Sequence, residues 1–265
     1  MVKNILITGS TDGIGLETAK KLLKQGHYVL LHGRNSRKLE NVVAELSALG
    51  KVESYVADLS DMNMVRKLAK EVSDHHKKLD VLINNAGVLK APNIVTKDGL
   101  DIRFAVNTIA PYLLTKLLLP LLDSKCRVVN LSSAAQASVD LDILTAKNNK
   151  LNAMDTYSQS KLAITMWSFA MADSLGSDGP IIITVNPGSL LASKMVHEGF
   201  GIVGNDISIG ADILVRVAIF DEFSDASGKY FDNDSKQFTN PHSDALNSQK
   251  CNAIITQIES FLSKL

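Results

Sequence analysis

The chain has 265 residues, of which 45% are hydrophobic, and its 28 basic side chains balance its 28 acidic ones. This length suits a single α/β domain built around a large sheet. Domains that bind nucleic acid or an anionic membrane usually carry a basic excess, so we expect neither partner. Two cysteines, Cys126 and Cys251, are too few for a disulfide framework, and we expect both to be reduced thiols.

Targeting and metal-binding signals are absent from the sequence as given. The six histidines show no metal-ligand spacing with cysteines or acidic residues, so no metal site is predicted. The first residues, MVKNILITGS, contain no apolar stretch long enough for a signal peptide or a membrane anchor. We therefore expect a cytoplasmic protein without a membrane anchor.

Short apolar runs alternate with longer helical patterns along the chain. The runs are apolar on both faces, as central parallel strands require, and cover residues 5–7, 28–31, 52–57, 81–83, 128–131 and 181–185. Helical patterns cover 38–49, closed by Gly50, then 61–76 with Asp61 as N-cap, 100–122, 157–175 and 245–262. The alternation predicts one α/β domain with a doubly wound, mainly parallel sheet and helices on both faces.

A glycine-rich turn follows the first predicted strand and precedes a helix. Gly9 permits a tight turn, Gly13 lets the backbone approach a pyrophosphate, and Gly15 lets the helix pack close to the sheet. The helix N-terminus then faces the phosphates. This context favours a dinucleotide-binding Rossmann fold over a ligand-free loop of small residues. The turn residues expected to contact the cofactor are Gly9, Ser10, Thr11, Asp12, Gly13, Ile14 and Gly15.

The end of the second strand indicates which nucleotide is bound. NAD-binding folds usually place an acid there for the ribose 2′-hydroxyl, but residues 32–38 contain no acid and three cations. Arg34, followed by Asn35, can grip a 2′-phosphate with its planar fork. We therefore expect NADP(H), with NAD(H) as the alternative. Ordinary surface charges at a helix start would give the same pattern.

Further motifs follow in a fixed order. They are Asp58-Leu59, Asn84-Asn85-Ala86-Gly87, Asn107, Ser132-Ser133, Tyr157-Ser158-Gln159-Ser160-Lys161 and Asn186-Pro187-Gly188. With the glycine turn, this order resembles the short-chain dehydrogenases/reductases over essentially the whole chain. The HGRN segment, the long interval from Ser133 to Tyr157 and the GKYF segment at 228–231 resemble the retinol-dehydrogenase-like branch.

The resemblance implies a cofactor half over residues 1–130 and a catalytic half over 131–265. It implies that Asp58 binds the adenine and that residues 84–87 line the cofactor floor. Small and polar residues at the carboxyl end of a strand also leave room for a ligand, although a structural turn would look the same. The cofactor contacts expected beyond the glycine turn are Arg34, Asn35, Asp58, Leu59, Asn85, Ala86, Gly87, Tyr157, Lys161, Pro187, Gly188 and Ser193.

Tyr157 and Lys161 lie four residues apart on a predicted helix and so share one face. Carbonyl reduction needs a proton donor at the oxygen while hydride reaches the carbon. A phenol has an ordinary pKa of about 10, and work near neutrality requires a drop of roughly three units. Lys161 and a positive nicotinamide both favour the phenolate. The resemblance implies that Lys161 also holds the nicotinamide ribose.

Two further residues complete the expected catalytic set. Ser133 follows the fifth strand, where its hydroxyl can polarise the substrate oxygen, and the family pattern favours it over Ser132. Pro111 has no N–H, so the Asn107 carbonyl loses its helical partner and is free to bind a water. Such a water would link Lys161 to solvent, as is proposed for the family. A kink that only suits packing is the alternative.

These features predict an NADP(H)-dependent oxidoreductase that interconverts an aldehyde or ketone and an alcohol, acting on an apolar small molecule. The alternatives are a non-catalytic NADP-binding sensor and an epimerase or dehydratase, for whose two-domain fold the chain is short.

Residues 189–206 are expected to form a mobile loop, with 195–203 as a substrate lid or a packing loop. Residues 112–122 and 162–171 are apolar nearly all round, which predicts a homodimer or homotetramer, or burial within one chain.

Overall fold

The computed structural model describes residues 1–144 and 151–265. The strands are β1 Asn4–Ile7, β2 Tyr28–Gly33, β3 Val52–Val56, β4 Val81–Asn84, β5 Arg127–Leu131, β6 Ile181–Asn186, β7 Lys229–Asp232 and β8 Gln237–Thr239. The helices are α1 Gly13–Lys24, α2 Ser36–Leu46, α3 Met62–His75, α4 Ile102–Phe104, α5 Ala110–Leu118, α6 Ala153–Leu175, α7 Lys194–Phe200, α8 Ser208–Ile219 and α9 Ser248–Leu262.

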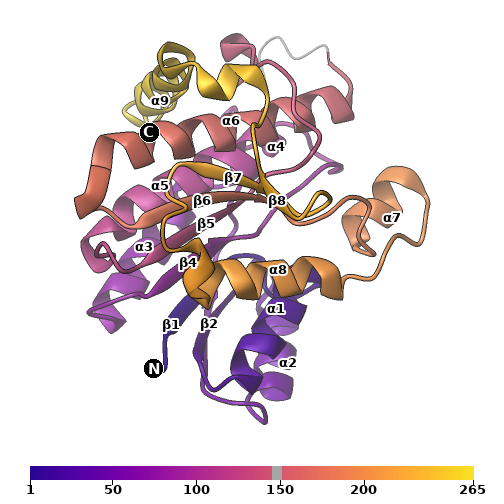
Figure 1. Cartoon of the computed structure of the whole chain (residues 1–265). Helices are drawn as coiled ribbons and strands as arrows, with labels where there is room; N and C mark the ends of the chain where they lie inside the picture. The colour runs from indigo at the N-terminus through magenta and orange to yellow at the C-terminus, as the bar shows by residue number, and fades with distance from the viewer. Residues whose placement is uncertain (145–150) are drawn as a thin grey trace.

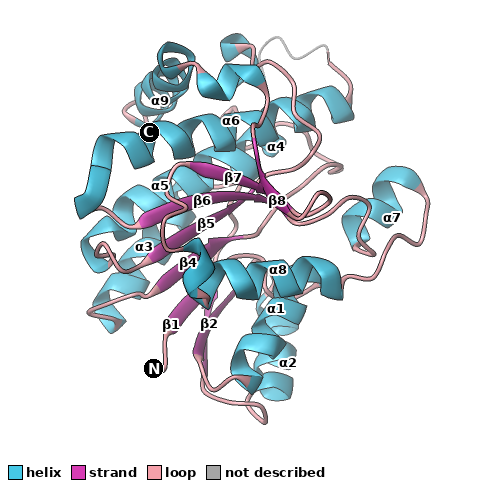
Figure 2. Ribbon diagram, in the orientation of Figure 1, coloured by secondary structure: helices cyan, strands magenta, loops and turns pink. Residues whose placement is uncertain are grey.

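The strands form one eight-stranded sheet in the order β3-β2-β1-β4-β5-β6-β7-β8 (Figure 2). Every neighbouring pair is parallel except β7 and β8. From β1 the chain first builds outward through β2 and β3, and then returns to the other side of β1 with β4. In such sheets ligands bind outside the carboxyl ends of the strands at this switch point.

Helices cover both faces of the sheet (Figure 1). Leu6 of β1 joins a core cluster with α3, α5, α6 and α9, whereas Ile5 and Ile7 join a second cluster with α1, α2 and α8. The strand pleat sends successive side chains to opposite faces, so a strand covered on both sides must be apolar throughout. The doubly wound α/β fold expected from the sequence is confirmed.

The six predicted strands lie where expected, with ends that shift by one or two residues. The final two strands were missed. β7 (KYFD) and β8 (QFT) mix polar with apolar residues, so neither forms the apolar run by which the central strands were predicted. The predicted helix at 38–49 is also shorter than expected: it ends at Leu46, so Gly50 does not cap it. The predicted C-terminal helix begins at Ser248 rather than at 245, after one 3-10 turn.

The long helical pattern at 100–122 is interrupted. After α4 the chain makes a π-helical turn over Ala105–Ile109, in which the Ala110 N–H bonds to the Ala105 carbonyl five residues back, and α5 follows. Pro111 cannot donate a helical hydrogen bond, and π-helical turns occur where the normal pattern fails. The expected break at Pro111 is therefore present as a π-helical turn that contains Asn107.

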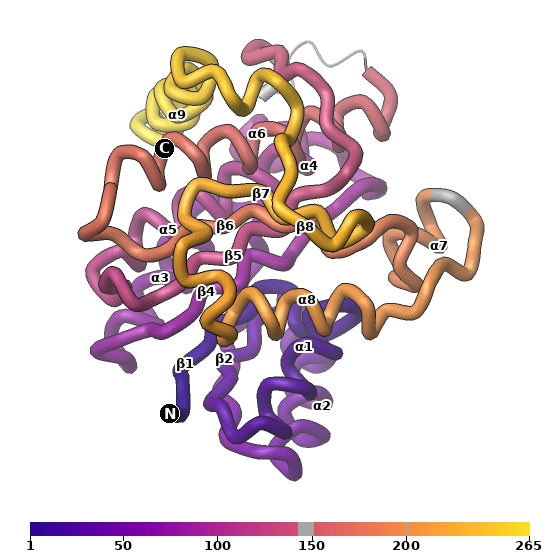
Figure 3. Tube along the Cα trace, viewed as in Figure 1, coloured from indigo at the N-terminus to yellow at the C-terminus, as the bar shows by residue number. Residues whose placement is uncertain are grey.

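The segment 189–206 is not the irregular loop that we expected, because it contains α7. The Ser193 side chain accepts a hydrogen bond from the Val196 N–H, and Gly201 closes the helix in the left-handed region at φ 70°. A serine N-cap and a C-terminal glycine are standard helix ends, but seven residues are too few to show a helical period. In Figure 3, α7 stands out from the body of the molecule at the right of the view.

The apolar helices α5 and α6 are covered within the chain. α9 packs along α6, and α3 packs along α5. Tyr112 of α5 meets Trp167 of α6 edge to face at 5.6 Å, and its hydroxyl donates to Glu259 of α9. Burial within one chain, the alternative considered above, thus accounts for the apolar pattern. Assembly into a homodimer or homotetramer stays a prediction that this pattern no longer supports.

One helical run, Ile102–Leu121, is long and apolar enough to cross a membrane by length and composition. Of the 18-residue stretch that meets this criterion, 67% is buried inside the described structure. Phe104 and Leu118 belong to the core cluster on the α3 face of the sheet. This run therefore has the surroundings of a core helix.

Candidate active site

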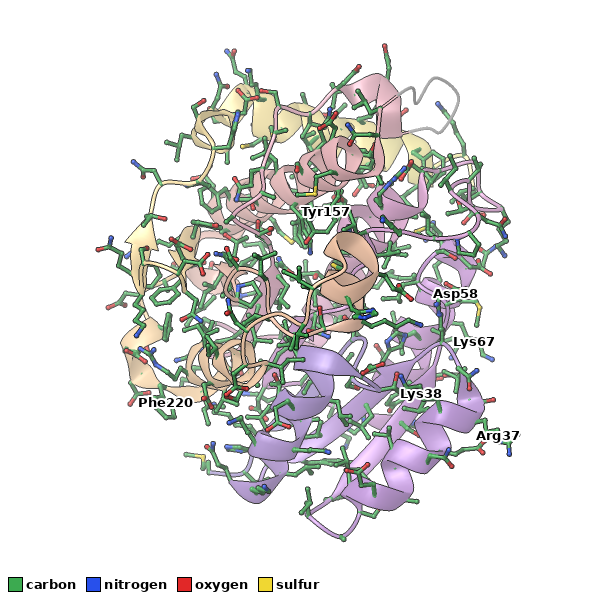
Figure 4. The ribbon with its side chains drawn as sticks, turned by 90° about the vertical axis from the view of Figure 1, so that its right-hand side faces the viewer. Arg37, Lys38, Asp58, Lys67, Tyr157 and Phe220 are labelled. Atoms are coloured by element: carbon green, nitrogen blue, oxygen red, sulfur yellow. The ribbon has the colours of Figure 1, made fainter. Side chains whose placement is uncertain are left out.

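A cleft of about 570 Å³ opens at the carboxyl ends of the parallel strands. The glycine turn, the ends of β2 to β6, and parts of α6 and α7 form its walls. Figure 4 shows Tyr157 on α6 above α7, with Lys38 and Asp58 on the other half of the molecule. The expected site residues that line it are Gly9, Thr11, Asp12, Gly13, Ile14, Arg34, Asn35, Asp58, Leu59, Asn85, Ala86, Gly87, Tyr157, Lys161, Pro187 and Ser193.

The glycine turn packs tightly against the segment after β4. Gly9 has φ 65°, and a Cβ there would lie 3.0 Å from the Ala86 Cα. A Cβ on Gly15 would lie 2.5 Å from the Gly9 carbonyl oxygen and 2.4 Å from Nδ2 of Asn85. Both positions therefore exclude a side chain. Gly13 has φ 57°, a backbone conformation that favours glycine, and a Cβ there would be in ordinary van der Waals contact with Ile207 at 3.8 Å and Ser193 at 3.9 Å.

Ser10, expected among the cofactor contacts, turns its side chain away from the cleft. The residue is fully buried, and its hydroxyl accepts the His32 N–H at 2.9 Å and donates to the His32 carbonyl at 3.3 Å. The side chain therefore ties the glycine turn to β2. The Ser10 N–H also donates to the His32 carbonyl, at 3.0 Å, so Ser10 supports the turn and does not line the cleft.

His32 is a structural centre of the cleft to which the sequence analysis gave no role. Its Nδ1 accepts the Gly9 N–H at 3.0 Å, which leaves the proton on Nε2, and this atom lies 3.1 Å from the Ala57 carbonyl. Burial lowers the pKa of His32 to about 4, so the ring is neutral at physiological pH. One neutral imidazole thus joins the glycine turn to the ends of β2 and β3.

The cations after β2 differ in where they point. Arg34 is exposed and lines the cleft, as does Lys38, whose Nζ lies 2.6 Å from Oδ2 of Asp12. The hydrogen bond from Lys38 lowers the pKa of Asp12. Arg37 lies on the outer side of α2 (Figure 4). Asn35 caps α2 by accepting the Lys38 N–H, so its side chain also has a local structural partner.

Asp58 and Leu59 line the cleft at the end of β3. One carboxylate oxygen of Asp58 accepts both the N–H and the hydroxyl of Ser60, at 2.9 and 2.8 Å. Asp58 therefore closes the turn before α3, and its other carboxylate oxygen is left for a ligand. Both the expected adenine contact and the alternative of a turn residue are compatible with this geometry.

Three of the four residues of the expected cofactor floor at 84–87 line the cleft. Asn85 donates to the Thr8 carbonyl at 2.8 Å, and Ala86 and Gly87 lie beside it in the cleft wall. Asn84 is the exception: its side chain is buried and donates to Asn130 Oδ1 at 2.7 Å. Asn84, the last residue of β4, points instead toward Thr115 of α5 and Asn130 of β5.

Tyr157 and Lys161 meet in the cleft on one face of α6. Lys161 is buried, and its Nζ lies 5.7 Å from the centre of the Tyr157 ring and donates to the Leu131 carbonyl at 2.7 Å. Burial lowers the pKa of Lys161 to about 8. Burial also raises the pKa of Tyr157 to about 12, against which a hydrogen bond from Ser133 acts. Without a ligand, the phenol is therefore protonated at neutral pH.

The two serines after β5 have different surroundings. Ser132 is buried, and its hydroxyl donates to the Lys161 carbonyl at 3.0 Å, so it fixes the sheet to α6. Ser133 hydrogen-bonds the Tyr157 side chain, and its Oγ accepts the Ala135 N–H at 3.1 Å. Of the two serines, Ser133 is therefore the one next to the phenol.

Asn107 lies behind the cleft wall. Its side chain pairs with the backbone of Val88, accepting the N–H at 2.8 Å and donating to the carbonyl at 3.0 Å. The same Nδ2 donates to Ser160 Oγ on α6 at 3.0 Å. A Cβ on Gly87 would lie 3.6 Å from both Asn107 Oδ1 and Lys161 Nζ. Asn107 and Lys161 therefore converge on the same point of the wall.

The loop after β6 brings the last expected residues to the cleft. Pro187 and Ser193 line it, and Ser193 lies 3.9 Å from where a Cβ of Gly13 would be. Gly188, with φ 123°, turns the chain behind them. Met195 and Glu198 of α7 complete this side, so α7 forms a wall of the cleft.

A family model described as short chain dehydrogenase matches residues 3–200. The chain belongs to the short-chain dehydrogenase family. It is 29% identical to retinol dehydrogenase 13 of Homo sapiens over 251 residues, 87% of this chain and 76% of that protein. It is 32% identical to retinol dehydrogenase 12 of Bos taurus over 254 residues, 90% of this chain and 80% of that protein. The expected retinol-dehydrogenase-like character is confirmed.

Solved structures agree with this membership. A protein from Mycobacterium paratuberculosis superposes with a TM-score of 0.82 at 26% identity, over 98% of this chain and 92% of that one. A short chain dehydrogenase from Burkholderia cenocepacia in complex with NADP superposes with a TM-score of 0.70 at 26% identity, over 87% of this chain and 95% of that one. The protein is therefore a nucleotide-dependent oxidoreductase, and the comparisons support a nicotinamide cofactor.

Proposed function

We propose that this short-chain dehydrogenase uses NADP(H) to interconvert an aldehyde or ketone and the corresponding alcohol. One observation carries the proposal: Tyr157 and Lys161 line the same cleft as the glycine turn. A phenol, an ammonium group and a dinucleotide cradle in one cleft are the set that hydride transfer to a carbonyl requires. Alone on a surface helix, Tyr157 and Lys161 would have no chemical role.

The cleft fits a dinucleotide by shape and by charge. Gly9 and Gly15 admit no side chain, and Gly13 begins α1, whose N-terminus is a place where phosphates bind favourably. Arg34 and Lys38 line the end of β2, where a 2′-phosphate would make charge-assisted hydrogen bonds. Asp58 would hold the adenine, residues 85–87 the floor, and Ser193 the carboxamide. NADP(H) is preferred on these grounds, with NAD(H) as the alternative.

When bound, the nicotinamide supplies or accepts the hydride. In reduction, Tyr157 gives its phenolic proton to the carbonyl oxygen, and Ser133 polarises that oxygen with its hydroxyl. In oxidation, Tyr157 must first be ionised, and a pKa of about 12 opposes this in the ligand-free cleft. Lys161 Nζ, 5.7 Å from the ring centre, favours the phenolate when it carries its positive charge.

Lys161 and Asn107 would carry the proton to solvent. Lys161 Nζ uses one proton for the Leu131 carbonyl, which leaves two donors for the ribose or for a water. Pro111 removes the N–H that would normally bond the Asn107 carbonyl, which can therefore hold a water. The Asn107 side chain keeps this wall in place through Val88.

The substrate is expected to be an apolar small molecule. Val88, Leu89 and Val106 line the cleft together with Met195 of α7. Met195 is a flexible side chain that adapts to differently shaped apolar ligands. α7 would act as the lid over this end of the cleft.

A carbonyl panel with NADPH and NADH in parallel tests the proposal, on the wild type and on Tyr157→Phe. We expect the substitution to lower kcat by at least about 10³-fold, equivalent to about 4 kcal/mol. Tyr112→Phe is the matched control, because its hydroxyl bonds Glu259 in the α5–α9 contact. Near-normal turnover by Tyr157→Phe would refute the mechanism. Cofactor binding without turnover across the whole panel would instead favour a sensor.

A further inference from the structure

The main-chain carbonyl of Ser133 is held by two side chains. The Tyr230 hydroxyl donates to it at 3.1 Å, and Nε2 of Gln136 donates to it at 3.0 Å. A carbonyl oxygen has two lone pairs, so these two donors saturate it. The Ser133 hydroxyl oxygen also accepts the Ala135 N–H at 3.1 Å. Ser133 is thereby fixed at its backbone and at its side chain.

Both donors connect Ser133 to a distant part of the chain. Tyr230 is itself far from Ser133 in sequence, and Gln136 bonds a residue that is far away. Tyr230 lies on β7 and is buried, with only 5% of its surface exposed. Burial raises the pKa of Tyr230, so its hydroxyl keeps the proton that it donates. Gln136 is fixed at its other end, because its Oε1 accepts the His242 N–H at 3.0 Å. The segment from β7 to residue 242 therefore grips the Ser133 turn from two sides.

The same segment also holds the loop after β6. Nδ2 of Asn233 donates to the Pro187 carbonyl at 2.9 Å. The β7–β8 hairpin thus contacts both loops that carry expected site residues at the carboxyl edge of the sheet.

We propose that Tyr230 and Gln136 are positioning residues, which hold Ser133 in the orientation where its hydroxyl bonds the Tyr157 phenol. The inference rests on the proposed function, since Ser133 and Tyr157 have a chemical role only there. A hydroxyl that donates to a phenolate favours ionisation, so losing this orientation raises the pKa of Tyr157. In alcohol oxidation, which needs the phenolate, the rise of kcat with pH would then move to higher pH.

The experiment compares Tyr230→Phe and Gln136→Met with Tyr112→Phe as the matched control. Each of the first two removes one donor to the Ser133 carbonyl and keeps the size of the side chain. We expect each to lower kcat for alcohol oxidation by roughly tenfold, the size of one lost hydrogen bond, and to shift its pH profile upward. KM for the cofactor should stay unchanged, as should all parameters of the control.

A second readout needs no cofactor or substrate. Hydrogen–deuterium exchange of the backbone amides at 133–137 should be faster in Tyr230→Phe and Gln136→Met, while β1 and β4 keep their protection. A residue that serves stability alone would speed exchange throughout the sheet and leave the pH profile of kcat in place. If Tyr230→Phe fails to fold, Gln136→Met decides, because Gln136 is only half-buried.

The outcomes separate the two proposals. An inactive Tyr157→Phe, together with an unchanged pH profile and unchanged local exchange in both positioning variants, would overturn this inference and leave the proposed function intact. An active Tyr157→Phe would overturn the proposed function. In that case the exchange measurement still decides whether Tyr230 and Gln136 hold the Ser133 turn.

Discussion

Asp12 and Lys38 form an ion pair of 2.6 Å at the end of the cleft where we place the 2′-phosphate of NADP(H). Both side chains are about half exposed, at 59% and 49%, and both line the cleft. Asp12 also caps α1 by accepting the Gly13 N–H at 2.8 Å. Lys38 therefore has an acidic partner that a bound phosphate must compete with.

Replacing Asp12 by Asn should strengthen NADPH binding. Asparagine is as good an N-cap as aspartate, so α1 keeps its start, while the competing negative charge is removed. An exposed ion pair is worth at most about 1 kcal/mol, so we expect the Kd for NADPH to fall by up to about fivefold. Fluorescence titration with NADPH and NADH at low salt measures this. An equal gain for both nucleotides would contradict the assigned position of the 2′-phosphate.

Replacing Arg34 by Ala should weaken NADPH binding selectively. Arg34 is exposed, lines the cleft and has the planar fork that binds phosphate in two places. Charge-assisted hydrogen bonds are worth about 1.5–3 kcal/mol, which predicts a rise in KM for NADPH of roughly ten- to a hundredfold. KM for NADH should hardly change. Arg37→Ala is the matched control, because Arg37 lies on the outer side of α2 (Figure 4).

The sequence was sufficient for the central strands and for the residues along the cleft, because both follow from local patterns. Strands buried on both faces must be apolar throughout, and a glycine turn between a strand and a helix has few other uses. Tyr157 and Lys161 share a helical face by spacing alone.

Other features depend on contacts that no local pattern reveals. The hydroxyl of Tyr230 reaches Ser133 across 97 positions of sequence, and His32 reaches Gly9 across 23. The helix α7 is too short to show a helical period, although Ser193 and Gly201 mark its ends. The coverage of α6 by α9 is a packing outcome, which an apolar pattern alone cannot distinguish from a subunit contact.

His32 should make the stability of the protein fall as the pH decreases. Its folded-state pKa of about 4 lies below the ordinary value of 6.5, so the unfolded chain binds more protons between these two values. Stability therefore rises with pH in this window: the contribution of the neutral ring is fully present above about 6.5 and is lost as the pH falls toward about 4. The difference between the two values corresponds to about 3 kcal/mol of unfolding free energy.

His32→Gln is the variant that isolates this contribution. Glutamine keeps a side chain that can accept the Gly9 N–H and donate to the Ala57 carbonyl, but it does not titrate. Urea unfolding at neutral pH and at several points down to about 4 should show that wild type loses stability relative to His32→Gln as the pH falls. Other titrating groups cancel in this difference. A constant difference across the window would mean that folding does not lower the pKa of His32, so that the ring protonates in the folded state as readily as in the unfolded chain.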